Sequence, residues 1–272
     1  MNDPADYTTT IATLDMPFLQ GEGPFRGFAD QAFAQQLATG IVFSVNNAIH
    51  PLCRIAAEDL QIHLQQQQEW THNFGLSSDT QGQVIGKMFG VLVVAHNNEI
   101  GYLAAFSGKL ANGNYHSRFV PPIFDGMEPG GFLAVGMKRI TGINTEIAAL
   151  AGTSSPEATA QIQQLKAARK ALSNGLQQQI FNEYNFINQA GAYKNLLDIF
   201  TPHGYRQPPA GAGECAAPKL LQYAFQQNMR PLALAEFWWG LSPKSATWQH
   251  KHFYAPCKEK CAPILSFMLD NY

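Results

Sequence analysis

Three of the four cysteines lie in the C-terminal part of the chain, at Cys215, Cys257 and Cys261. Cysteine thiolates are zinc ligands, and zinc takes about four donors in a tetrahedron. His250, His252 or a water molecule would complete the set. Cys257 and Cys261 are separated by three residues rather than by the two of most zinc knuckles, but an i, i+4 pair can share one helix face. The pattern allows a zinc site at these three cysteines, but the residue types favour the alternative, a group of small buried or free thiols.

The order of elements around these cysteines is similar to that of zinc-dependent nucleoside deaminases. Those enzymes have a hairpin, then a helix that opens with a His or Cys ligand and carries a Glu two residues later, then a strand, and then P-C-x-x-C on a helix. The corresponding segments here are the hairpin 86–106, Cys215, the strand 231–239 and Pro256-Cys257. Ala217 occupies the position of that Glu, and Cys261 comes one residue late. The pattern predicts a cytidine-deaminase-like fold with a lost or altered activity.

Two carboxylates near these cysteines are candidates for proton transfer. Glu236 lies within the apolar segment LAEFWW, which is typical of a buried strand. Because an unpaired buried charge is costly, Glu236 should pair with Lys109, Lys219 or a metal. The alternatives are a structural salt bridge or an outward position on an edge strand. Glu214, directly before Cys215, is the second candidate.

Aromatic residues and histidines gather in the same segment, at Trp238, Trp239, Trp248, His250, His252 and Tyr254. Such rings could stack on nucleobases, which is worth about 1–3 kcal/mol per base. Neighbouring residues of a strand point to opposite faces, so at least one of Trp238 and Trp239 should belong to the core. No phosphate-binding G-x-x-x-x-G-K-[ST] loop and no G-x-S-x-G nucleophile turn is present.

Periodicity predicts the elements that must position these residues. A helix is expected over 52–70, a hairpin from 86–95 and 100–106, and helical structure over 140–200 with an interruption at Gly175. A helix over 215–227, a strand over 231–239 and a last helix opening at Pro256-Cys257 should follow. Parallel strands joined by a helix would give an α/β fold, a two-layer or three-layer sheet with flanking helices.

This order of elements divides the chain into three parts. Residues 1–40 are expected to form an N-terminal arm, 41–139 together with 201–272 the α/β core domain, and 140–200 a helical insert. The core domain would then hold the cysteines, the carboxylates and the aromatic residues.

Composition limits the classes of function. The 272 residues are 46% hydrophobic and 14% charged, with a net charge of −2, so a sizeable core is expected and a strongly basic nucleic-acid binder is not. The N-terminal Met1-Asn2-Asp3-Pro4 lacks the basic and apolar regions of a signal peptide, and no apolar run reaches the ~20 residues of a membrane helix. We therefore expect a cytoplasmic protein without a membrane partner.

Several long blocks resemble one family. They are HPLCRIAAEDLQ (50–61), IGKMFGVLVV (85–94), IGYLAAFSGKL (100–110), FVPPIFD (119–125), PPAGAGECAAPKLLQYAF (208–225), PLALAEFWWGLSPKS (231–245) and FYAPCKEKCAPILSFML (253–269). They are similar to the N-terminal extension of long RluA-type pseudouridine synthases, which isomerise uridine in structured RNA. The resemblance covers most of residues 41–269. In that family the catalytic aspartate stands in an HRLD-type motif of a following domain, and this chain contains no such motif.

The resemblance implies an RNA-modification context without pseudouridine synthesis by this chain. The first hypothesis is a non-catalytic domain that binds ribosomal or transfer RNA, or a pseudouridine synthase catalytic domain, with no DNA partner expected. The second is a zinc-dependent hydrolase of the deaminase type that acts on a nucleobase or nucleotide. The third is a structural interaction module.

Overall fold

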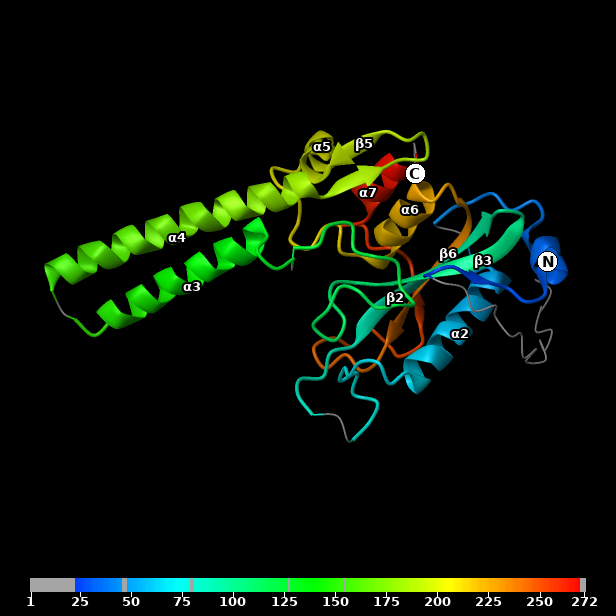
Figure 1. Ribbon diagram of the computed structural model, residues 1–272, viewed down its shortest axis with the longest axis horizontal. Helices are drawn as coiled ribbons and strands as arrows, with labels where there is room; N and C mark the ends of the chain where they lie inside the picture. The colour runs from blue at the N-terminus through cyan, green and yellow to red at the C-terminus, as the bar shows by residue number, and fades with distance from the viewer. Residues whose placement is uncertain (1–22, 46–47, 79–80, 127, 154, 270–272) are drawn as a thin grey trace, which may run out of the picture.

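The structure, a computed structural model, describes residues 23–45, 48–78, 81–126, 128–153 and 155–269. It is a mixed α/β fold built on a five-stranded sheet of order β1-β3-β2-β6-β7 (Figure 1). The described elements are, in chain order, β1 (Arg26–Gly27), α1 (Gln31–Ala38), α2 (Pro51–Gln66), β2 (Lys87–His96), β3 (Glu99–Phe106), α3 (Phe132–Leu150), α4 (Pro156–Glu183), β4 (Asn185–Ile187), β5 (Tyr193–Asn195), α5 (Leu196–Phe200), the 3-10 helix η1 (Thr201–His203), α6 (Ala216–Gln226), β6 (Arg230–Trp239), β7 (Phe253–Tyr254) and α7 (Ala262–Met268).

The centre of the sheet is the predicted hairpin with β6 beside it. β2 and β3 pair along their whole length, and Asn97 and Asn98 turn the chain between them with positive φ angles, which asparagine tolerates well. β6 lies on the other side of β2 and is antiparallel to it. Each neighbouring pair of strands in this sheet is antiparallel, so the expectation of parallel strands is wrong.

Helices cover both faces of the sheet, which makes it the middle layer of three. α6 packs on one face against Leu92, Leu103 and Leu234. α2 packs on the other face against Val91 and Phe237. Both faces of β2 and β6 are therefore buried, which explains why these strands are nearly continuous apolar runs.

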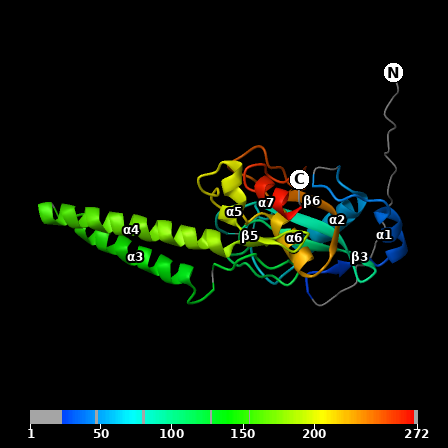
Figure 2. The same cartoon turned by 90° about the horizontal axis from the view of Figure 1, so that it is seen from above.

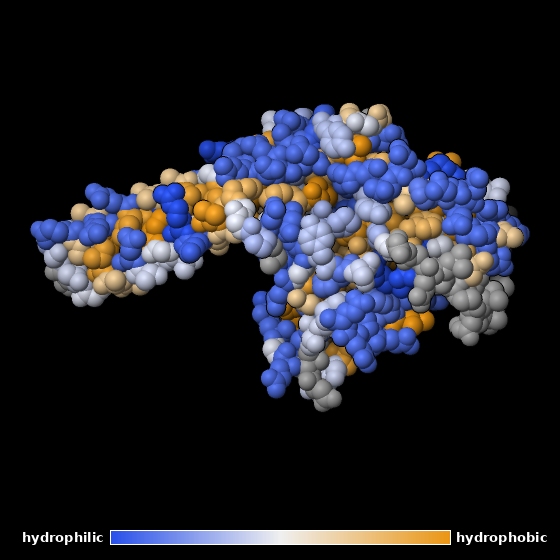
Figure 3. Space-filling view, in the orientation of Figure 1, coloured by the Kyte–Doolittle hydropathy of each residue, from blue (hydrophilic) through white to orange (hydrophobic). Residues whose placement is uncertain are grey.

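A long helical hairpin, α3 and α4, projects from this core (Figures 1 and 2). Apolar or small residues repeat at alternating three- and four-residue steps, at Leu133, Gly136, Ile140, Ile143, Ile147 and Leu150 in α3 and at Ala158, Ile162, Leu165, Leu172 and Leu176 in α4. This is the heptad spacing of a coiled coil, and hydrophobic residues accordingly lie along the arm between hydrophilic ones (Figure 3). Arg169 takes one of the seam positions and donates to Asn144 at 2.8 Å.

The helical segment differs from the prediction at both ends. It begins at Phe132 rather than near residue 140, and α4 continues through Gly175 without the expected interruption. After Glu183 the chain forms the small β4–β5 hairpin and α5 instead of further long helix. The seam explains the unbroken helix, because tertiary packing outweighs the low helix propensity of one exposed glycine.

Candidate metal centre

The structure brings Cys215, Cys257 and Cys261 together. Their three sulfur atoms all lie within 4.8 Å of one another, and those of Cys257 and Cys261 are 3.3 Å apart. Sulfurs that share a tetrahedral zinc ion with Zn–S bonds of about 2.3 Å are separated by about 3.8 Å. The cluster therefore has the donor type and the size that a zinc ion requires.

Cys215 reaches the cluster from the start of a helix. It is the N-cap of α6, where its side chain makes no capping hydrogen bond and stays available to a ligand. The chain arrives through Gly213, whose φ of 90° suits glycine, and a Cβ there would lie 2.7 Å from the ring of Tyr184. The N-terminus of α6 also presents its positive dipole end to the thiol, which favours the thiolate.

Cys257 and Cys261 occupy a turn and not a helix. The Cys261 N–H donates to the Cys257 carbonyl at 3.2 Å, and α7 begins only at Ala262. The prediction that Pro256-Cys257 opens the last helix is therefore wrong by about one turn. This single turn still brings residues i and i+4 to the same side, so the two sulfur atoms of the C-x3-C segment lie close together, as they would in a longer helix.

Hydrogen bonds within the cluster act differently on the three thiols. Those with Cys215 and Cys261 lower the pKa of Cys257, while hydrogen bonding within the cluster and burial raise the pKa of Cys215 and Cys261. Cys257 is also exposed, whereas Cys261 is buried. The cluster consequently offers one accessible sulfur, and a bound cation would favour the thiolate form of all three.

Glu236 lies beside the cysteines in the middle of the core. It is 4% exposed, and its Oε1 accepts a hydrogen bond from the Ala217 backbone N–H at 3.0 Å. Burial and, to a smaller extent, the Cys257 charge raise the pKa of Glu236 to about 7, against the opposing effect of that hydrogen bond. Among the described residues neither Lys109 nor Lys219 bonds to it, so the expected lysine pairing is wrong.

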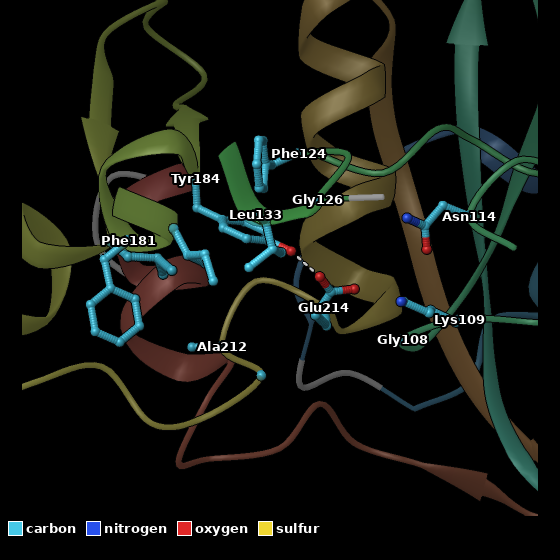
Figure 4. Close-up of a pocket in the computed structure, with 13 residues that line it drawn as sticks. Gly108, Lys109, Asn114, Phe124, Gly126, Leu133, Phe181, Tyr184, Ala212 and Glu214 are labelled. Carbon is cyan, nitrogen blue, oxygen red and sulfur yellow. Dashed lines mark hydrogen bonds between the residues drawn. The ribbon is translucent and has the colours of Figure 1, made fainter. Parts of the chain in front are cut away.

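Glu214 serves another group of residues. It accepts a short hydrogen bond from the Tyr184 hydroxyl (Figure 4) and forms a 3.4 Å ion pair with Lys219. Lys219 is buried, which lowers its pKa despite the opposing effect of Glu214. Lys109 and Asn114 line the same cavity of about 370 Å³, at the base of the arm. Glu214 and Lys109 thus belong to this neighbouring cavity rather than to the sulfur cluster.

Neither predicted histidine joins the cluster. The Nδ1 of His250 accepts from the Gly240 N–H at 3.0 Å, and its ring lies 4.4 Å from that of Trp239. His252 is exposed and contacts the His250 carbonyl through Nδ1. The described His, Cys, Asp and Glu groups that gather closely enough for a metal are the three cysteines alone. A water molecule is the remaining predicted candidate for a fourth donor.

One of the two tandem tryptophans belongs to the core, as expected, and the fourth cysteine, Cys53, is buried as well. Cys53 is fully buried in α2, on the opposite sheet face, and burial raises its pKa to about 12. Trp239 belongs to the same core at 1% exposure. Trp238 points to the other face and stacks on Trp248, with ring centroids 5.4 Å apart.

Sequence reasoning missed two contributors to the site. The Ala217 N–H holds the Glu236 carboxylate, and Tyr184 fixes Glu214 from α4's C-terminal cap. The residue type at position 217 does not indicate a backbone donor, because every residue except proline has one. No sequence motif marks Tyr184, which lies at the end of a helix. The pairing of Gly90 with Glu236 leaves space beside the carboxylate, but this register is visible in the structure and not in the sequence.

No helix in the described part of the chain combines the length and the apolar character needed to cross a membrane. Comparison with protein-family models, with curated proteins and with solved structures finds no match to this chain.

Proposed function

We propose that this protein is a zinc-dependent hydrolase of the deaminase type. The observation that carries the proposal is the convergence of Cys215, Cys257 and Cys261 beside the buried carboxylate of Glu236. Three protein ligands are the usual number in catalytic zinc sites, which keep the fourth position for water, whereas structural sites are closed by four. A buried carboxylate adjacent to such a position can carry a proton.

The position of Glu236 supports this role more strongly than the sequence did. Ala217 stands where the deaminase pattern has its glutamate, two residues after the helix-opening ligand. The carboxylate of Glu236 reaches the Ala217 N–H from β6. The carboxylate that α6 lacks is in this way supplied by the neighbouring strand. The cytidine-deaminase-like fold is part of this proposal, and the hairpin, α6 and β6 follow the order that the pattern requires.

The proposed reaction replaces an exocyclic amino group of a nucleobase by oxygen. Zinc, when bound, supplies a Lewis acid that activates water near neutral pH. Glu236 accepts one water proton as the new C–O bond forms and passes it to the ring nitrogen beside the reacting carbon. It then takes the proton of the new hydroxyl group and donates it to the leaving amino nitrogen as the C–N bond breaks, so that ammonia departs and a carbonyl remains. The Ala217 N–H keeps the carboxylate oriented during both transfers.

The test measures metal and ammonia separately. Purified protein should contain about one zinc per chain by mass spectrometry, and Cys257→Ser should lose it. Cys53→Ser is the matched control, because this cysteine lies on the other sheet face and should leave the zinc in place. Glu236→Gln should retain zinc but release no ammonia from cytosine- or adenine-containing nucleosides, nucleotides and RNA. Metal-free protein in which Cys257→Ser changes nothing would refute the proposal.

A non-catalytic role in RNA modification is the second candidate. It is favoured by the resemblance to the pseudouridine synthase extension and by the alanine at position 217. In that case the zinc centre stabilises a domain that binds RNA or a synthase catalytic domain, and the cytoplasm remains the expected location. Zinc-loaded protein that releases no ammonia from any of these substrates, yet binds ribosomal or transfer RNA in a salt-sensitive manner, would favour this candidate.

A further inference from the structure

A groove with an aromatic wall lies at the end of β6 and is not used by the proposed reaction. We call it the aromatic groove; Val84, Gly86, Trp238, Leu241 and Trp248 line it, and Lys244 is at its rim. Its volume is about 680 Å³. Leu241 is 50% exposed, so the groove presents apolar surface to solvent. Contiguous apolar surface rimmed by polar residues often marks a binding site.

Two half-buried tryptophans line the groove, and the half-buried ring of Tyr254 contacts one of them. Trp248 stacks on Trp238 with an interplanar angle of 20°, and Tyr254 meets Trp248 edge-on with centroids 4.7 Å apart. The Tyr254 hydroxyl donates to the Thr247 carbonyl and accepts from the Gln249 N–H, both at 2.8 Å. These two bonds hold the loop that carries Trp248, so the rings are positioned before any ligand arrives.

The groove is on the same face of the sheet as the metal centre. Glu236 and Trp238 are two residues apart on β6, so their side chains share a face at a distance of about 7 Å along the strand. Tyr254 pairs directly with Glu236 in β7 and precedes Cys257 by three residues. A ligand that reaches both the metal centre and the groove must span at least this distance.

The charge around the groove favours a polyanion. The segment 241–261 carries four lysines, Lys244, Lys251, Lys258 and Lys260, and one acid, Glu259, which gives +3 from four positive and one negative charge. The whole chain has a net charge of −2, so this segment is a local basic region. Lys244 is the member of this set that lines the groove, whereas Lys251 lies over the ring of Trp239 on the other face of the sheet. An apolar peptide would gain nothing from Lys244, whereas a phosphate would.

One buried donor in the wall has no acceptor. The Nε1 of Trp238 is out of contact with solvent and has no hydrogen-bond partner among the described residues. Indole nitrogen only donates, and buried donors in folded proteins are nearly always paired. Since solvent does not reach this nitrogen, a ligand oxygen would pair with it only after a shift of the Trp238 ring.

We propose that the aromatic groove binds the nucleotide next to the one whose base enters the metal centre, so that the ligand is a single-stranded nucleic acid rather than a free nucleotide. Trp248 offers the stacking surface and Lys244 contacts the phosphate. The position of the target base rests on the proposed function, but binding in the groove can be measured without any reaction.

The experiment measures the binding of a fluorescein-labelled, mixed-sequence 12-nucleotide RNA to the full-length protein by anisotropy at several salt concentrations. DNA of the same sequence and duplex RNA are compared with it, and zinc is measured in each variant. Trp248→Ala should weaken single-strand binding by roughly 5- to 150-fold, the range for loss of one stacked base. Lys244→Glu should weaken binding and reduce its salt dependence. Lys166→Glu, at an exposed site on the arm, is the charge-matched control and should change neither.

Each outcome decides the inference. Single-strand binding that both groove variants weaken while zinc content stays unchanged supports it, and the RNA-to-DNA ratio then reports whether the 2′-hydroxyl contributes. Binding that neither variant affects, equal affinity for duplex RNA, or no binding by zinc-loaded protein would overturn it and leave the hydrolase proposal standing. If Glu236→Gln loses ammonia release but still binds RNA, the result supports both the hydrolase proposal and the groove proposal. If the protein contains no zinc but binds RNA through the groove, the result refutes the hydrolase proposal and leaves RNA binding in the groove supported.

Discussion

The buried carboxylate of Glu236 should make the stability of the metal-free protein depend on pH. Burial raises its pKa from 4.5 to about 7. Above pH 4.5 the unfolded chain ionises this group first, so the free energy of unfolding falls between about pH 4.5 and pH 7 and is then constant. A shift of about 2.5 pKa units corresponds to about 3 kcal/mol at pH 8. Glu236→Gln removes the ionisation, and its amide oxygen can still accept from the Ala217 N–H.

Urea unfolding at pH 5 and pH 8, followed by tryptophan fluorescence after removal of metal by a chelator, measures this effect. Glu236→Gln should lose up to about 3 kcal/mol less than the wild-type protein between the two pH values. Glu99→Gln, at an exposed position of β3, is the control and should behave like wild type. Added zinc should reduce the difference, because a nearby cation favours the carboxylate. Equal losses in wild type and Glu236→Gln would refute the argument that burial controls this group.

Two further substitutions test the arm and its base. Gly136→Ala places a Cβ 2.4 Å from Cδ2 of Leu176, so packing between α3 and α4 should loosen and the free energy of unfolding should fall by about 1–3 kcal/mol. Amide hydrogen exchange should become faster in α3 and α4 only. Unchanged exchange would contradict the close packing at this position. Tyr184→Phe removes the hydroxyl that donates to Glu214 and should lower the free energy of unfolding, measured in urea, by about 1–2 kcal/mol. No change in this free energy would show that the hydrogen bond contributes no net stability.

Local pattern was sufficient for the hairpin and for β6 but not for their relative direction. Residues 87–96 and 99–106 are two apolar runs on either side of an Asn-Asn turn, and turn chemistry alone sets their antiparallel register. More than 120 residues separate β3 from β6 along the chain (230 minus 106 is 124). The run Arg230–Trp239 indicates burial on both faces, which suits a parallel or a central antiparallel strand equally well. The direction of β6 is set by packing between distant segments, which periodicity does not record.

In the candidate site, too, the positions of single residues depend on contacts between distant segments, which the sequence pattern does not record. The convergence of Cys215, Cys257 and Cys261 could be predicted, because few arrangements other than burial or a metal account for three such cysteines. The exclusion of His250 could not, since its ring is fixed by a backbone donor on the opposite side of β6. The role of Glu236 depends on strand register, and a shift of one residue would have turned it to the α2 face.

The small residues around Glu236 explain how β6 can supply a carboxylate to the start of α6. Gly90 pairs with Glu236 across β2 and β6, and a Cβ at Gly90 would lie 3.0 Å from Cβ of Ala216 and 3.5 Å from Cγ of Glu236. Glycine on β2 and alanine on α6 therefore allow the helix to approach the sheet closely enough for the Ala217 N–H to reach the carboxylate. A glutamate side chain at position 217 would bring a second carboxylate close to Glu236, and two adjacent buried carboxylates do not ionise together. The alanine at 217 and the glutamate at 236 are thus two parts of one arrangement, in which the strand provides the acid and the helix provides only its backbone donor.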